Sequence, residues 1–283
     1  FDDTDDEIKI LADTIEKNKS LGIDKIWPSR FLIGLMDLNA ASSYVNSSLI
    51  VDRVRMIKDE EEKELMRRAS KLNDMAMERL KEELAKGYSE KELSDVLRGT
   101  YKEIGADGFS FSPIIAFGAN GANPHHSNTD KVAQIGDSII LDIGCVKDSY
   151  CSDMTRTVFL KEASEKSKEV FDIVLEANKR AINEVKPGAR FCDIDKAARD
   201  YIESKGYGEY FTHRTGHSIG IEVHDHGDVS AVNDDVLEAG MIFSIEPGIY
   251  LPGEIGVRIE DLVLVTDDGC EVLNRVNKEM CII

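Results

Sequence analysis

The sequence predicts an α+β fold built from two similar halves and preceded by a small α/β segment. Three observations support this prediction. Four amphipathic segments carry apolar residues at helical spacing and fall into two pairs. Each pair is followed by apolar, strand-like segments that predict a β-hairpin. The order helix, helix, hairpin therefore occurs twice, which suggests a pseudo-twofold domain with a site near its axis.

Length and composition limit the classes of protein to consider. With 283 residues the chain is one large domain or two ordinary ones, and 42% hydrophobic residues can bury a sizeable core. The net charge of −19 argues against partners such as nucleic acid or an anionic membrane surface, because proteins that bind these present a basic face. We find no apolar run of the roughly 20 residues that span a bilayer, and we expect no signal peptide because no basic, then apolar, segment opens the sequence.

The five cysteines form no CxxC pair, which indicates reduced thiols in a cytoplasmic protein. Residues 1–57 are predicted to form a separate α/β piece, with a helix over 8–17 and a strand over 44–50. This piece is too small to hold a strong core alone. Because the first residue is Phe1, we expect the natural N-terminus to be missing. Residues 58–283 form the second predicted domain.

The second domain opens with a long helix that follows a charged run and ends at Gly87. Acidic residues in its first turn suit the helix dipole. Ser89 and Glu92 form a capping box that starts the next helix, through about Ile104. Two later helices are predicted over 164–185 and 192–205.

An internal repeat relates the two halves of this domain. Its two copies lie about one hundred residues apart, and both contain glycines at the helix ends and before the hairpin. The matched pairs are Gly87 with Gly188, Gly105 with Gly206, and Gly136 with Gly240. Because the order of elements is also the same, chance similarity between helices is the weaker explanation.

Each predicted hairpin carries two acidic residues. A two-residue loop at 147–148 would place Asp142 opposite Asp153, and a three-residue loop in the second hairpin would place Glu246 opposite Glu260. Like charges directly opposite each other are destabilising. One carboxyl group of each pair is then protonated, or cations occupy the gap. Solvated hairpin faces would explain either hairpin alone, but the matched pairs favour two divalent ions.

All histidines of the chain lie in two short stretches, which favours a shared site. These residues are His125, His126, His213, His217, His224 and His226. One of them would supply a nitrogen ligand, and others would bind substrate or shuttle protons. A strand is predicted after His217, and it must bend, at Gly220, if His217 and His224 are to face one site. A site rich in carboxylates selects hard ions such as Mn²⁺, which support hydrolysis of an amide, ester or phosphate.

On these residues the chain resembles the pita-bread metallopeptidases, which include methionine aminopeptidase, aminopeptidase P and prolidase. The resemblance covers about 58–283. The matching motifs are Leu141-Asp142-Ile143-Gly144, Ser152-Asp153-Met154-Thr155-Arg156-Thr157, Thr215-Gly216-His217-Ser218-Ile219-Gly220, Val223-His224-Asp225, Glu246-Pro247-Gly248-Ile249-Tyr250 and Val257-Arg258-Ile259-Glu260-Asp261.

The resemblance implies a pita-bread fold and a role for each matching residue. Asp142 would bind one ion, His217 and Glu246 the other, and Asp153 and Glu260 would bridge both. Glu246 would also help to activate the nucleophile. The remaining implied roles are a proton shuttle for His125, which fits better than His126, stabilisation of the tetrahedral intermediate by His224, and pocket positions for His213, Tyr250 and Arg258.

The spacing of Glu246 and Glu260, together with residues 1–57, resembles the aminopeptidase P and prolidase branch. That branch implies hydrolysis of the bond between an N-terminal residue and a following proline, in peptides with proline in second position. It implies two divalent metal ions, with Mn²⁺ expected and Co²⁺ or Zn²⁺ as alternatives, and a homodimer. It also implies that residues 1–57 are the C-terminal part of a creatinase/prolidase-like domain whose first half is absent from this chain.

Three alternatives stay open at this point. The first is an Xaa-Pro dipeptidase (prolidase), because the sequence does not identify a group that captures a free C-terminal carboxylate. The second is a metal-free, creatinase-like hydrolase, and the third is a non-catalytic pita-bread binding module. Members of the last two classes lose ligand carboxylates, whereas all five ligand positions are filled here.

Overall fold

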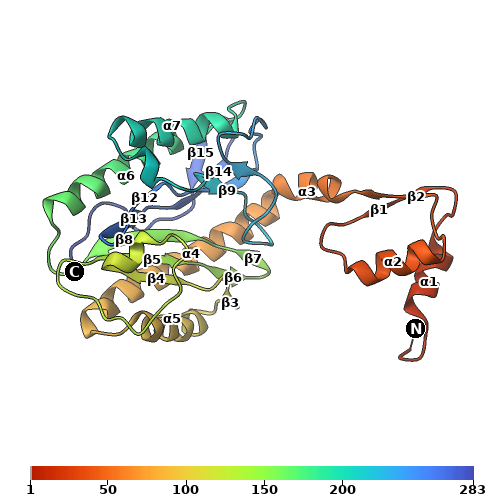
Figure 1. Ribbon diagram of the computed structural model, residues 1–283, viewed down its shortest axis with the longest axis horizontal. Helices are drawn as coiled ribbons and strands as arrows, with labels where there is room; N and C mark the ends of the chain where they lie inside the picture. Colours follow the sequence, from red (N-terminus) through yellow and green to blue (C-terminus); the bar gives the residue numbers. More distant parts are fainter. Residues whose placement is uncertain (1) are drawn as a thin grey trace. The chain divides into compact units, whose positions relative to one another are not determined.

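The computed structural model describes residues 2–283, and the chain divides into two compact units. The N-terminal unit runs to Arg55, and the C-terminal unit runs from Met56 to Ile283 (Figure 1). The N-terminal unit has a two-stranded parallel sheet over a small core of Ala12, Leu35 and Ala40. Its elements are α1 (Glu7–Thr14), β1 (Ser20–Ile23), α2 (Ser29–Asp37), β2 (Ser43–Asn46) and α3 (Ser48–Met56), which ends at the boundary.

The strand expected over 44–50 is wrong beyond Asn46. The backbone N–H of Ser48 donates to the side chain of Asn46, and α3 begins there instead. Short polar side chains that bind the backbone two residues away favour such a turn over a continuing strand.

The four helices expected in the C-terminal unit are confirmed. The first two of these helices each begin with a capping box. Asp59 and Glu62 form the first box, and Ser89 and Glu92 form the second. The helices are α4 (Glu60–Glu83), α5 (Glu90–Ile104), α6 (Glu165–Asn183) and α7 (Phe191–Ser204). The short 3₁₀ helices are η1 (Leu84–Lys86), η2 (Gly118–Ala122) and η3 (Gly208–Tyr210).

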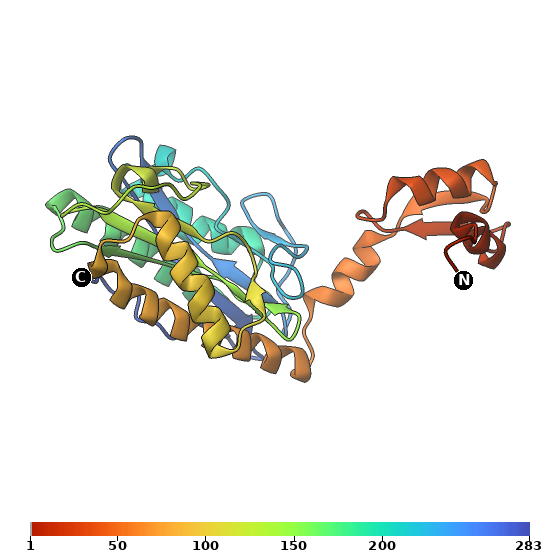
Figure 2. The ribbon, with the colours of Figure 1, turned by 90° about the horizontal axis from the view of Figure 1, so that it is seen from below.

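The strands of the C-terminal unit lie between α4 and α5 on one side and α6 and α7 on the other (Figures 1 and 2). The first half contributes β3 (Gly108–Phe109), β4 (Ile114–Phe117), β5 (Ser138–Ile143), β6 (Cys145–Lys147), β7 (Tyr150–Cys151) and β8 (Met154–Phe159). The second half contributes β9 (Gly216–His217), β10 (Asp228–Val229), β11 (Ile242–Ile245), β12 (Gly248–Leu251), β13 (Ile255–Arg258), β14 (Asp261–Val265) and β15 (Cys270–Val272).

All strand pairs of this unit are antiparallel, apart from one isolated bridge near the C-terminus. Their sheets follow the orders β4-β5-β8, β3-β6-β7, β11-β14-β15, β12-β13 and β10-β9. One apolar core joins α4 and α5 to the first sheet through residues such as Leu97 and Leu141. Another joins α6 and α7 to the second half through Phe171 and Ile245. Each helix pair thus packs mainly on the strands of its own half, and a third core joins Met66 of α4 to Ile242 and Leu264 of the second half.

The C-terminal unit is the mixed α and β fold that the sequence predicts. Two glycines matched by the repeat lie just after helices: Gly105 caps the end of α5, and Gly206 follows the cap of α7, with φ of 83° and 84°. This left-handed conformation suits a glycine because it has no Cβ. The similarity is in keeping with the repeat, and descent of the two halves from one duplication stays a prediction.

The registers of the two hairpins differ in how well the sequence predicts them. In the second hairpin Leu251 pairs with Ile255 and Ile245 with Asp261, so the register that opposes Glu246 and Glu260 is confirmed. In the first hairpin the expected register is wrong. Asp142 lies opposite Thr155 rather than opposite Asp153.

The first hairpin shifts because its turn lies at 148–149, where both residues have positive φ. Asp107 selects this turn: its carboxylate accepts from the backbone of Asp148 and from the side chain of Lys147. The register shifts by two residues. Because side chains alternate with a period of two, Asp142 and Asp153 still face the same side of the hairpin.

The strand expected after His217 is also wrong, although the expected bend is present. Strand β9 ends at His217, and a loop follows Gly220, in which the N–H of Asp225 donates back to Ser218 O at 2.9 Å. This loop brings the rings of His217 and His224 to a centroid distance of 4.3 Å in an edge-to-face arrangement.

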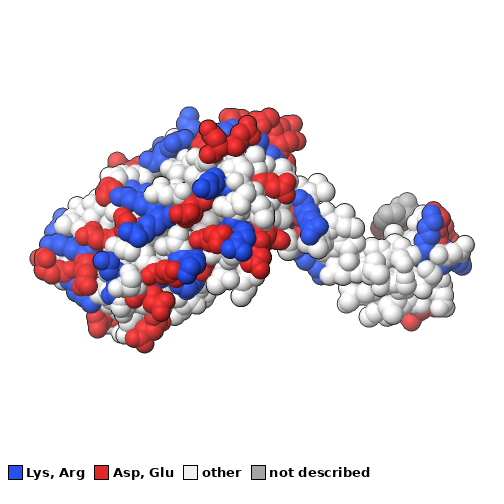
Figure 3. All heavy atoms as spheres, turned by 90° about the horizontal axis from the view of Figure 1, so that it is seen from above, with Lys and Arg blue, Asp and Glu red and all other residues white. Residues whose placement is uncertain are grey.

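No helix within residues 2–283 combines the length and the apolar character that crossing a membrane requires. All five cysteines are free thiols. On the face of the C-terminal unit shown in Figure 3, acidic and basic side chains are interspersed.

Candidate metal centre

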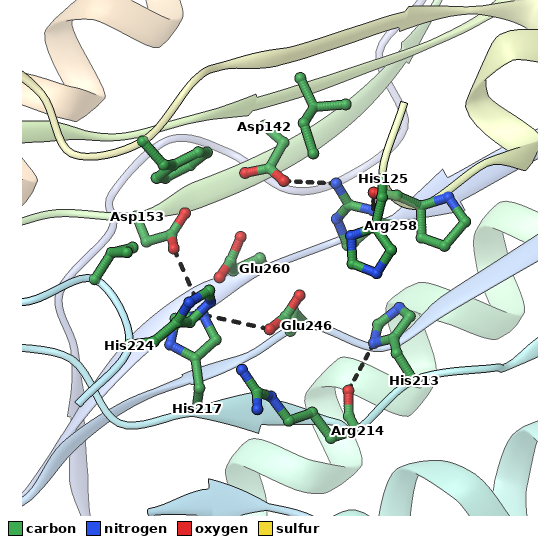
Figure 4. A pocket seen from close by; sticks show the side chains of 14 residues that line it. His125, Asp142, Asp153, His213, Arg214, His217, His224, Glu246, Arg258 and Glu260 are labelled. Atoms are coloured by element: carbon green, nitrogen blue, oxygen red, sulfur yellow. Dashed lines mark hydrogen bonds and ion pairs between the residues drawn. The ribbon is translucent and has the colours of Figure 1, made fainter. Parts of the chain in front are cut away.

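A cavity of about 490 Å³ in the C-terminal unit is lined by acidic and histidine side chains from both halves (Figure 4). Strand β5 supplies Asp142, and β9 supplies His217. Asp153, Glu246 and Glu260 lie at the breaks between consecutive strands, where the sheets end. The cavity is lined by Phe111, Ile114, Pro124, His125, Asp142, Asp153, His213, Arg214, His217, Val223, His224, Glu246, Arg258 and Glu260.

Three buried side chains in this cavity are close enough to share one cation. The ligand atoms of Asp153, His217 and Glu260 all lie within 4.8 Å of one another. His217 Nε2 is 3.7 Å from Asp153 Oδ2 and 3.5 Å from Glu246 Oε1. The arrangement joins one nitrogen donor to several carboxylate oxygens.

Several carboxylate oxygens in the cavity are buried and have no hydrogen-bond partner among the described residues. They are Asp142 Oδ1, Asp153 Oδ1 and Glu260 Oε1. A buried polar atom without a partner is costly, so native proteins rarely keep one unless it serves another purpose. Oxygen atoms from carboxylates, with one imidazole, are the donors that hard divalent ions prefer. These residues therefore fit a site for divalent metal ions.

Neighbouring groups orient the donors. His217 Nδ1 lies 3.2 Å from Ser218 O, so we assign its proton there, which leaves the lone pair of Nε2 facing the carboxylates. Thr155 Oγ1 donates to Glu260 Oε2 at 2.7 Å. The backbone N–H of His217 donates to Ser244 Oγ at 3.0 Å, and that hydroxyl donates to Glu246 at 3.3 Å.

A second set of hydrogen bonds connects Arg258 to the far wall of the cavity. Arg258 Nη2 donates to Asp142 Oδ2, and Arg258 Nη1 donates to the hydroxyl of Tyr250 at 2.9 Å. The Tyr250 hydroxyl lies 2.8 Å from His213 Nε2, and His213 Nδ1 lies 2.6 Å from Arg214 O. We assign a neutral His213 that donates from Nδ1 to Arg214 O and accepts a hydrogen bond from the Tyr250 hydroxyl at Nε2. Each donor in this series of hydrogen bonds then has an acceptor.

Burial shifts the pKa of several of these groups. It raises the pKa of Asp153 and of Glu260 well above their ordinary values, and repulsion from neighbouring carboxylates adds to this. Burial raises the pKa of Glu246 to about 7. Burial lowers the pKa of His217 to about 3 and that of His213 to about 4, so both imidazoles are neutral at pH 7.

The structure separates the two histidines of the first stretch. His125 lines the cavity, whereas the ring of His126 points elsewhere and lies 2.8 Å from Glu90. In the second stretch His224 lines the cavity, and His226 does not belong to its lining. Of the sequence-predicted site residues, only Tyr250 lies behind the wall, where it contacts Arg258 and His213.

Sequence reasoning missed Arg214, which lines the cavity and forms an ion pair of 2.7 Å with Asp228. Its place between His213 and the Thr215-Gly216-His217 segment was the available signal. Phe111 and Ile114 were also missed, because an apolar residue in a pocket wall looks like any core residue in the sequence.

A two-halved α+β fold with a buried centre of carboxylates and one imidazole is the arrangement of a metal-dependent enzyme, and the relatives of this chain identify the class as hydrolases. The family model described as metallopeptidase family M24 matches residues 64–267. An uncharacterized peptidase of Staphylococcus aureus strain MSSA476 is 42% identical over 237 residues, which are 84% of this chain and 68% of that protein.

Solved structures agree. The recombinant prolidase of Thermococcus sibiricus has a TM-score of 0.95 and 38% identity, with 100% of this chain and 78% of that chain covered. The X-Pro aminopeptidase of Thermotoga maritima MSB8 has a TM-score of 0.90 and 35% identity, with 100% and 81% covered. The Xaa-Pro dipeptidase of Bacillus anthracis has a TM-score of 0.91 and 38% identity, with 98% and 78% covered.

The chain belongs to metallopeptidase family M24, in its pita-bread branch of prolidases and X-Pro aminopeptidases. It is therefore a metal-dependent peptidase.

Proposed function

We propose that this protein is an Xaa-Pro aminopeptidase, which hydrolyses the bond between an N-terminal residue and a proline in second position. The observation that carries the proposal is the set of unpartnered, buried carboxylate oxygens on Asp142, Asp153 and Glu260, which face one cavity together with His217. Two divalent ions are proposed, with Mn²⁺ preferred and Co²⁺ or Zn²⁺ as alternatives.

Asp142 would hold one ion, His217 and Glu246 the other, and Asp153 and Glu260 both. Bound there, such ions would supply a nucleophile at neutral pH and would polarise the scissile carbonyl. The protein side chains then orient the substrate and move its protons.

Glu246 is proposed as the group that accepts the proton of the attacking water, because its carboxylate lines the cavity and its Oε1 lies 3.5 Å from His217 Nε2. His125 would carry a proton to the leaving proline nitrogen. His224 would donate a hydrogen bond to the carbonyl oxygen of the scissile peptide group, where negative charge develops. His213, Tyr250 and Arg258 would hold the substrate side of the pocket in place.

Prolidase activity, on Xaa-Pro dipeptides alone, is the second candidate, and Arg214 favours it. This guanidinium lines the cavity and is about one third exposed, and a free C-terminal carboxylate would bind it beside, or in place of, its present partner Asp228. The neighbouring structures include both prolidases and an X-Pro aminopeptidase.

The test is a comparison of Xaa-Pro with Xaa-Pro-Yaa peptides, with Mn²⁺ and with Co²⁺. An aminopeptidase cleaves the longer peptides at least as well as the dipeptide. If only dipeptides are cleaved, and Arg214→Gln raises KM for them about tenfold or more, the protein is a prolidase. Cleavage of neither peptide with either metal would contradict both proposals.

We also propose that residues 1–57 belong to a creatinase/prolidase-like N-terminal domain and that the protein is a homodimer. Ile26, Ile33, Ile50 and Val54 are each more than half exposed on the small N-terminal unit, and large exposed apolar surfaces mark interaction sites. Light scattering coupled to gel filtration tests the dimer. Fluorescence of Trp27, the single tryptophan of the chain, reports unfolding of this unit separately.

A further inference from the structure

One buried carboxylate, that of Glu90, holds the loop on which His125 lies. Glu90 is the first residue of α5, its side chain is fully buried, and it does not belong to the lining of the metal-centre cavity. Its oxygens accept five hydrogen bonds. The donors are Phe117 N at 2.9 Å, Asn120 Nδ2 at 2.8 Å, His126 Nε2 at 2.8 Å, Thr129 N at 2.7 Å and Thr129 Oγ1 at 2.6 Å.

These donors span residues 117–129, most of the segment 117–131. Oε1 binds its beginning, and Oε2 binds its middle and end. The backbone supports the same arrangement, because the N–H groups of Glu90 and Lys91 donate to Lys131 O and Thr129 O. A segment with little regular structure is thus tied to the start of a helix by one side chain.

The carboxylate is ionised at neutral pH. Burial raises the pKa of Glu90, but the hydrogen bonds from Thr129, His126 and Asn120 outweigh burial and lower the pKa below its ordinary value. An ionised carboxylate only accepts hydrogen bonds, so it can serve all five donors. The isosteric amide of glutamine would point its own NH₂ group at some of them.

His125 lies between two anchored neighbours. On the cavity side, Pro124 O accepts from Arg258 Nη1 at 3.4 Å, and Figure 4 shows His125 beside Arg258. The backbone N–H of His125 donates to Asn123 Oδ1 at 3.0 Å. On the other side His126 binds Glu90. The residues before and after His125 are therefore both held.

We propose that Glu90 is a positioning residue that keeps His125 directed into the active-site cavity, through His126 and Thr129. This inference rests on the proposed role of His125 in proton transfer. Proton transfer requires a geometry held within a fraction of an ångström, and a displacement of about 1 Å can cost roughly 100-fold in rate.

The first experiment measures the loop itself. Hydrogen–deuterium exchange of the metal-free protein is compared for the unmutated chain, Glu90→Gln and Ser89→Ala. In Glu90→Gln the amide NH₂ group faces at least two of the five donors, so we expect the amides of 117–131 to exchange at least tenfold faster. Ser89→Ala is the matched control: it removes the capping hydroxyl of the same helix turn but none of the five bonds.

The second experiment measures turnover with Mn²⁺ present at saturation. Glu90→Gln is expected to lower kcat about tenfold or more, with KM changed less than threefold and with the bound Mn²⁺ per chain unchanged. His126→Ala should act in the same direction, and His126→Gln, whose amide can still donate to Glu90, should recover most of the loss. Ser89→Ala should retain the kcat of the unmutated protein.

Unchanged exchange of 117–131 in Glu90→Gln would overturn the inference, as would a kcat equal to that of Ser89→Ala. Loss of Mn²⁺ in Glu90→Gln would also overturn it, because the effect would then arise at the metal centre. An unmutated protein that binds Mn²⁺ but cleaves no Xaa-Pro peptide would contradict the proposed function, whereas the exchange experiment would still measure the anchoring of the loop.

Discussion

Arg258 Nη2 donates to Asp142 Oδ2 at 2.5 Å, and this bond joins the second hairpin to the first. Both side chains are largely buried. The pairing leaves Asp142 with one oxygen held by the protein and one without a partner. The halves of the fold thus meet at a carboxylate that is only half satisfied.

Replacing Arg258 by Met leaves the Asp142 carboxylate buried without its counter-charge. Breaking a buried ion pair on one side costs about 3–5 kcal/mol of unfolding free energy. We expect a loss of this size in urea unfolding with EDTA, followed by far-UV circular dichroism because Trp27 lies in the other unit. The double variant Arg258→Met/Asp142→Asn should recover part of the loss. A single variant as stable as the unmutated protein would contradict the structural role of this pair.

His217 and His224 are in edge-to-face contact, but we expect their substitution to have different effects on metal binding and on turnover. His217→Ala should lose bound metal. His224→Ala should keep its metal but lower kcat about 100-fold, because one donor to developing charge typically contributes 10²–10³-fold. Metal analysis and peptide kinetics measure both. His226→Ala is the control from the same loop, and its kcat should stay within twofold of the unmutated protein.

Asp74 predicts a pH-dependent difference in stability. Burial raises the pKa of its carboxyl group to about 6, from 3.8 in the unfolded chain. A raised pKa means that the folded state favours the protonated carboxyl group. The contribution of Asp74 to the free energy of unfolding is therefore fully present below about pH 4 and is lost as the pH rises through about 6. Asp74→Asn keeps an acceptor for the backbone of Arg275 but carries no charge.

Relative to the unmutated protein, Asp74→Asn should therefore gain stability between pH 4 and pH 7. Urea unfolding of both proteins at several pH values measures this difference, and other titrating groups cancel in the comparison. A difference that is the same at pH 4 and pH 7 would show that Asp74 titrates normally.

Local sequence signals predicted the helices well, because capping boxes and glycines mark their ends and apolar spacing marks their faces. The second hairpin was also predictable, since its turn contains Pro252 and Gly253. The first hairpin was not. Its turn depends on Asp107, which is distant in the sequence and binds Lys147 and Asp148.

The candidate site could be located from clustered acids and histidines, but the partners of its residues could not. Glu90 looks like an ordinary first-turn acid of a helix, yet it is buried and accepts five bonds from a distant loop. The prediction of a strand after His217 was wrong for a similar reason. A loop that packs on two sides can show the same alternation of polar and apolar residues as a strand. Contacts between distant segments decide such cases.

Asp153 and Glu260 are proposed to hold divalent metal ions shared by the two halves. Equilibrium dialysis against Mn²⁺ at neutral pH tests it directly. We predict two ions per chain for the unmutated protein and loss of both in the double variant Asp153→Asn/Glu260→Gln, with loss of peptidase activity. The claim is contradicted if the unmutated protein binds no divalent ion, or if the double variant binds Mn²⁺ as the unmutated protein does.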